Sequence, residues 1–158
     1  MATLVSRVEV AWDRYYPILC GLSSSIAFLA LGRQGMQYMV DNQWEIANIY
    51  GDAFNFFGVL TAFLFTFYTF VVTADRGFIG KMKGTYPYRC LISYTLRALF
   101  LAGLVTVASI FLHVAKPAPV HFGPSFYWLA AWVGSVVWAA VSFIRAAHLF
   151  SVFANLHT

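Results

Sequence analysis

Charged residues are scarce in this chain of 158 residues: Asp, Glu, Lys and Arg make up 10%, and hydrophobic residues make up 61%. A water-soluble globular protein carries about 25% charged residues. The chain therefore has too few polar side chains to cover a hydrated surface, which excludes a soluble domain. The mean hydropathy of +0.72 and the aromatic content of 19% also exclude intrinsic disorder. An integral membrane protein is the class that remains.

Cysteine is also rare, and motifs for soluble chemistry are missing. The two cysteines, Cys20 and Cys90, cannot build a disulfide framework, and we expect them to be free thiols. The sequence contains no C-x-x-C, phosphate-binding loop, dinucleotide fingerprint, zinc-ligand spacing or nucleophile elbow. We therefore do not expect an enzyme.

Long apolar runs dominate what is present. They cover residues 15–32, 53–74, 91–114 and 125–144, close to the length of about 20 residues that a membrane-spanning helix needs. None of them alternates apolar and polar residues as the strands of a membrane barrel do. The sequence predicts an all-α integral membrane protein, a four-transmembrane-helix bundle that forms one domain over residues 1–158.

Lysine and arginine are unevenly distributed between the predicted loops. The side with both termini and the loop of residues 75–90 carries Arg7, Arg14, Arg76, Lys81, Lys83, Arg89 and Arg145, whereas the other side carries Arg33 and Lys116. Because positively charged loops stay in the cytoplasm, we expect both termini to be cytoplasmic. Within the basic loop 75–90, we expect Arg76, Lys81, Lys83 and Arg89 to contact lipid headgroups. Nucleic acid is not an expected partner, since no domain presents these charges.

The second run carries polar and small residues on one helical face. This face contains Asn48, Asp52, Asn55, Ala62, Thr66, Thr69 and Thr73, and the opposite face contains Phe54, Phe57, Leu60, Leu64, Phe65, Tyr68, Val71 and Val72. We expect the apolar face to contact lipid and the polar face to point inward. A polar stripe through a span can line a water path when several copies surround an axis. It can equally serve helix packing through small residues and interhelical hydrogen bonds, and the sequence leaves both interpretations open.

Two ionisable residues lie within or at the edge of the predicted spans. Asp52 lies at the outer edge of the second run, where an interfacial and a buried carboxylate are both compatible with the sequence. Arg97 lies six residues into the third run, about 9 Å from its inner end. Its side chain can reach the interface by snorkelling, or face the bundle and pair with Asp75 or a lipid phosphate. We expect this third helix to be packed on both sides.

The fourth run carries small residues at a spacing that is typical of contacts between membrane helices. Ala131, Ser135 and Ala139 have the small-xxx-small spacing of helix contacts in membranes.

The histidines fall on opposite sides of about 30 Å of hydrocarbon, with His113 and His121 outside and His148 and His157 inside. No inner and outer pair can therefore ligate one haem, and we expect neither a cofactor nor a metal.

Residues 58–97 resemble part of small bacterial inner-membrane proteins with four helices. The shared features are a Phe- and Thr-rich span, a short basic loop of the type GFIGKMK, a tyrosine and another span. Some proteins of this kind resemble membrane effectors of antiphage systems. The resemblance implies a bacterial inner membrane and a possible role in antiviral defence, and it assigns no functional residue.

Three functions are compatible with these features. The first is a homo-oligomer that acts as a pore or membrane-perturbing effector, either alone or with a cytoplasmic trigger protein. The second is an accessory or scaffold subunit whose helix faces bind another membrane protein. The third is a small cation- or proton-coupled transporter that uses Asp52. Membrane lipids are partners in all three.

Overall fold

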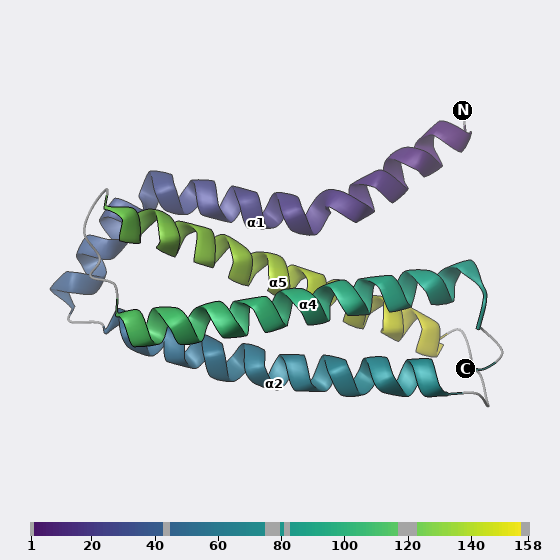
Figure 1. Cartoon of the computed structure of the whole chain (residues 1–158). Helices are drawn as coiled ribbons and strands as arrows, with labels where there is room; N and C mark the ends of the chain where they lie inside the picture. Colours follow the sequence, from purple (N-terminus) through teal and green to yellow (C-terminus); the bar gives the residue numbers. More distant parts are fainter. Residues whose placement is uncertain (1, 43–44, 75–79, 81–82, 117–122, 156–158) are drawn as a thin grey trace. The chain divides into compact units, whose positions relative to one another are not determined.

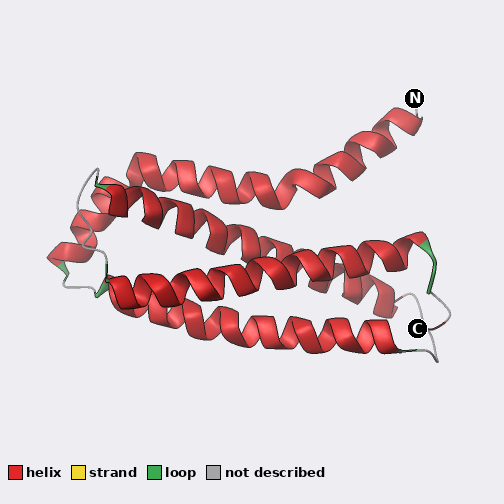
Figure 2. Ribbon diagram, viewed as in Figure 1, coloured by secondary structure: helices red, strands yellow, loops and turns green. Residues whose placement is uncertain are grey.

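The computed structural model describes residues 2–42, 45–74, 80, 83–116 and 123–155. Within these residues the chain forms four long α-helices and no β-strand (Figure 1, Figure 2). The helices are α1 (Ala2–Asp41), α2 (Ile46–Thr73), α4 (Tyr86–Ala115) and α5 (Pro124–Asn155). Among the described residues, each helix contains a segment long and apolar enough to cross a membrane. The predicted all-α class with four apolar helices is confirmed.

The helices extend beyond the apolar runs for local reasons. The helix α4 begins at Tyr86 because the Thr85 hydroxyl accepts a hydrogen bond from the Tyr88 backbone N–H at 3.5 Å and a proline occupies the first turn. It ends at Lys116, which adopts the left-handed conformation with φ of 41°. The helix α5 continues past Arg145 to Asn155. The tail after Arg145 therefore extends the fourth helix.

The structure falls into two compact units. The first comprises Met1–Trp44 and Ala118–Val141, and the second comprises Glu45–Pro117 and Ser142–Thr158. The helix α5 contributes its first part to the first unit and its second part to the second.

In the first unit, two glycines allow α1 and α5 to approach closely. A Cβ at Gly21 would lie 2.8 Å from Trp138 Cβ and 2.9 Å from the Gly134 carbonyl oxygen, and a Cβ at Gly134 would lie 2.8 Å from the Gly21 carbonyl oxygen. Beside this contact, the Ser25 hydroxyl donates a hydrogen bond to the Ala130 carbonyl at 3.1 Å. Small residues at helix contacts are the usual device for close packing in a membrane.

In the second unit, α2 and α4 run antiparallel, side by side (Figure 1). The buried residues of α2 include Tyr50, Phe57, Leu64 and Val71, which recur every seven residues. After Leu91, the buried residues of α4 are small or medium, namely Thr95, Ala98, Ala102, Val105 and Ser109, spaced alternately by three and four. This is the heptad spacing of helices that pack knobs into holes. Large side chains on α2 thus fill the space that small side chains on α4 leave.

The second part of α5 completes this unit. The rings of Phe67 on α2 and Phe150 on α5 lie edge to face with centroids 4.9 Å apart. The guanidinium of Arg145 on α5 lies 3.8 Å from the centroid of the Tyr94 ring on α4, a cation–π contact. Aromatic contacts therefore tie α5 to both other helices of the unit.

Candidate functional site

The polar stripe predicted on α2 lies on the surface of the single chain. All seven of its members are exposed, namely Asn48, Asp52, Asn55, Ala62, Thr66, Thr69 and Thr73. The buried heptad positions lie on the other side of the same helix. Packing within the second unit, which contains α2 and α4, therefore does not cover the stripe. Its role as a pore lining or as a contact between molecules stays a prediction.

The threonines of the stripe satisfy their hydroxyl hydrogens within α2. The Oγ1 atoms of Thr66, Thr69 and Thr73 donate to the carbonyls of Ala62, Phe65 and Thr69 at 3.0, 2.9 and 2.8 Å. Such bonds remove the cost of an unpaired donor in lipid. Each oxygen keeps lone pairs that can accept from water or from another helix. The threonine part of the stripe therefore tolerates lipid and is also able to line water.

The expectation that the apolar face of α2 contacts lipid is wrong for four of its residues. Phe57, Leu60, Leu64 and Val71 are buried, whereas Phe65 and Val72 are exposed. The physical reason is that both lipid and the interior of a membrane protein are apolar, so hydrophobicity does not distinguish them. The bulky residues face the small residues of α4 and form the core of the second unit.

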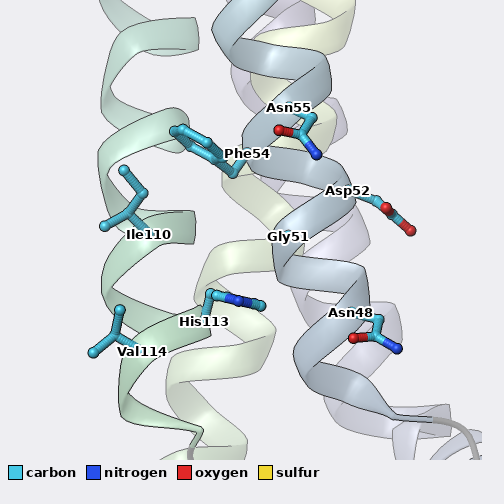
Figure 3. Close-up of a pocket in the computed structure, with 8 residues that line it drawn as sticks. All are labelled: Asn48, Gly51, Asp52, Phe54, Asn55, Ile110, His113 and Val114. Atoms are coloured by element: carbon cyan, nitrogen blue, oxygen red, sulfur yellow. The ribbon is translucent and has the colours of Figure 1, made fainter.

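A pocket lies where α2 begins and α4 ends. It has a volume of about 590 Å³ and is lined by Asn48, Gly51, Asp52, Phe54 and Asn55 from α2 and by Ile110, His113 and Val114 from α4 (Figure 3). A Cβ at Gly51 would lie 3.4 Å from two ring atoms of His113, so the absence of a side chain at Gly51 makes room for the imidazole. In Figure 3 the imidazole extends from α4 toward Gly51, and the Asp52 carboxylate points away from α4.

The pocket joins groups that sequence reasoning treated separately. The sequence places Asp52 on the polar stripe and His113 among the outer histidines, and in the structure both residues and two carboxamides line one pocket. The antiparallel pairing of α2 with α4 brings them together, and no sequence spacing encodes that pairing. In the part of the chain that the structure describes, no group of three or more His, Cys, Asp or Glu side chains is placed to hold a metal ion. The pocket offers one carboxylate, one imidazole and two amides, a set suited to hydrogen bonding with a small polar or cationic ligand.

Arg97 lies on the exposed side of α4. Ser93, Arg97 and Leu104 are exposed, whereas Thr95 and Ala98 on the other side are buried. Within the second unit, the small-residue side of α4 is packed, and the expectation that α4 packs on both sides stays a prediction. Asp75, suggested as a partner of Arg97, lies outside the described residues.

The structure describes part of the basic loop and all three predicted contact residues of α5. In the basic loop, Lys83 is half-buried and Arg89 is exposed, while Arg76 and Lys81 lie outside the described residues. On α5, Ala131 is exposed, Ser135 is half-buried with its hydroxyl donating to the Ala131 carbonyl at 2.8 Å, and Ala139 is buried.

The contact between α1 and α5 uses a different set of residues, namely Phe126, Ala130, Gly134 and Trp138. Sequence reasoning missed this set, although the pattern of Gly134 four residues after Ala130 on one helical face was available as a signal.

Comparisons with protein-family models, with curated proteins and with solved structures give no match for this chain.

Proposed function

We propose that this chain spans the membrane with four helices and assembles with copies of itself into a ring that forms a pore or perturbs the membrane. The observation that carries the proposal is the exposed polar stripe of α2, which runs from Asn48 to Thr73 opposite the buried residues Phe57, Leu60, Leu64 and Val71. A surface that faced only lipid would gain nothing from two carboxamides and a carboxylate, since polar groups in hydrocarbon are costly. Contact with other copies around a water path gives these groups partners.

The arrangement of the stripe indicates how such a ring conducts. The threonine oxygens present acceptor lone pairs along one part of the helix, and Asp52 and Asn55 add polarity near its start. In a ring of copies, the Asp52 carboxylates form a ring of negative charge at one mouth, which favours cations. We assign both termini to the cytoplasm of a bacterial inner membrane, because the basic residues gather on that side.

The experiment is an ion-flux assay with purified protein in liposomes. The double variant Thr66→Val, Thr69→Val keeps shape but removes both hydroxyl oxygens from the stripe, and we expect it to lower the flux per protein. The matched control is Thr106→Val on α4, because the half-buried Thr106 also donates to a carbonyl of its own helix, at 2.8 Å, but lies off the stripe. Equal flux from wild type, double variant and control would contradict the pore.

A second candidate function is favoured by the pocket of Asp52 and His113. A carboxylate and an imidazole that line one pocket at a helix end are the groups that bind and release a proton or cation in transporters. The variant Asp52→Asn separates the two functions. A transporter loses coupled uptake in this variant, whereas a pore keeps its flux and loses preference for cations over anions.

A further inference from the structure

An apolar groove runs along α2 and α4 in the middle of the second unit. It is a shallow, open groove with a volume of about 1000 Å³, with Gly58, Ala62 and Gly103 among its lining residues and the rings of Phe65, Phe100 and Phe111 beside them. The groove exists because small residues leave space where the two helices meet: a Cβ at Gly103 would lie 3.9 Å from Thr61 Cγ2.

The groove is apolar along its whole length. Among its lining residues only Thr61 carries a polar side chain, and its hydroxyl donates to the Phe57 carbonyl of its own helix at 2.7 Å. A polar ligand would find no hydrogen-bonding partner there, so the shape and chemistry suit a hydrocarbon chain.

Arg97 places a positive charge on the face of α4 that lines the groove, beyond one end of the groove. Arg97 precedes Leu104 by seven residues and Ala108 by eleven, and both of these residues line the groove. Such spacing places all three on one face of α4, with Arg97 about 10 Å from Leu104 along the helix axis. The Arg97 side chain is exposed and makes no ion pair with any described residue.

We infer that the groove binds one acyl chain of a phospholipid whose phosphate contacts the Arg97 guanidinium. Guanidinium is the side chain best suited to phosphate, because its planar fork donates two parallel hydrogen bonds. An arginine inside the apolar length of a helix is costly unless an anion or water reaches it. A lipid phosphate meets that need, and basic sites between transmembrane helices near the cytoplasmic surface bind lipid headgroups in this manner.

A second copy of the chain is the competing occupant of the groove. The acidic residue of α2, Asp52, lies level with the far end of α4, because its neighbour Gly51 faces His113. His113 is sixteen residues from Arg97, or about 24 Å along the helix. A phospholipid supplies both the hydrocarbon and the negative charge in one molecule. The inference requires only that the helices span a membrane, and it shares one residue, Ala62, with the polar stripe of the proposed ring.

Native mass spectrometry of the intact protein in detergent tests this inference, with dioleoyl phosphatidylglycerol and dioleoylglycerol as probes. The two lipids have the same chains, and only the first has a phosphate. We expect one tightly retained phosphatidylglycerol per chain and no retained dioleoylglycerol. Equal retention of the two lipids would overturn the role of Arg97.

Two variants locate the lipid on the protein. Arg97→Gln should weaken phosphatidylglycerol binding by about tenfold or more, as expected for the loss of charge-assisted hydrogen bonds, and Ala108→Leu should weaken it by filling the groove. Lys116→Gln is the control, since it removes one positive charge from the opposite end of α4. Binding unchanged in either test variant, or equally reduced in the control, would contradict the site.

Two further variants test the geometry of the Arg97 contact and the identity of the occupant of the groove. If Arg97→Gln does not fold, Arg97→Lys keeps the charge but loses the bidentate geometry, and it should bind phosphatidylglycerol more weakly than wild type. The exposed Val107 lines the groove, so Val107→Cys reports a second copy. A disulfide between copies at this position that forms equally with and without added lipid would show a protein occupant and overturn the inference.

Discussion

At the scale of single residues, the contact between α1 and α5 depends on the missing side chain of Gly21. We expect Gly21→Ala to lower the free energy of unfolding by about 1–3 kcal/mol, because the added methyl meets helix backbone and Trp138 Cβ at less than 3.0 Å. Thermal unfolding in detergent, followed by circular dichroism, measures the change.

Gly35 provides a matched control on the same helix. A Cβ at Gly35 would have nothing within 4 Å, so Gly35→Ala should be neutral or raise the free energy of unfolding by about 0.5–1 kcal/mol through helix propensity. Equal effects of the two substitutions would show that α1 and α5 do not approach as described.

Thr95 gives a second prediction at this scale. Its side chain is 1% exposed, and its Oγ1 is the buried side-chain polar atom for which the described structure offers no hydrogen-bond partner. An unpaired buried hydroxyl costs about 1–3 kcal/mol, so the isosteric Thr95→Val should raise the free energy of unfolding. Thr106→Val, where the hydroxyl has a partner, should not raise it. A loss of stability in Thr95→Val would mean that the hydroxyl binds water or another group.

At the scale of the element, the apolar side chains of α2 lie in two environments, the protein core and the exposed surface. Two residues that are adjacent in the sequence can lie in different environments. Leu64 is 2% exposed and Phe65 is 60% exposed. We expect Leu64→Ala to lower the free energy of unfolding by about 1–3 kcal/mol, below the range for water-soluble cores because lipid and core are both apolar. Phe65→Ala should have little effect. Equilibrium unfolding in mixed micelles measures both, and the reverse ranking would show that α2 is rotated.

The elements also show how far sequence reasoning reaches. The existence of all four helices followed from the apolar runs, since few other structures satisfy the backbone in lipid. The apolar runs did not predict where the helices begin and end. The start of α4 depends on the Thr85 cap, and the end of α5 depends on helical spacing that continues past Arg145. The predicted orientation of α2, with its apolar face toward lipid and its polar face inward, was wrong in part. Hydrophobicity does not indicate which face points inward in a membrane, because lipid and protein core are both apolar.

The candidate site was predicted only in fragments. The polar stripe of α2 is a property of one helix and could be derived from helical periodicity alone. The pocket of Asp52 and His113 and the glycine contact of Gly21 with Gly134 each join residues from two helices. Their register is set by packing between helices, which one sequence does not specify.

At the scale of the whole molecule, the proposed function makes self-assembly necessary. The exposed stripe of α2 needs neighbours to enclose a water path. The stripe carries the same polar groups in every copy, so rotational symmetry would bring all of them to one axis.

The most direct measurement is the copy number of the intact protein in lipid nanodiscs, by native mass or particle imaging. The proposal predicts a closed ring of four or more copies with α2 facing the axis. A monomer or dimer under the same conditions would contradict it, and the exposed stripe would then be the binding face for a different membrane protein.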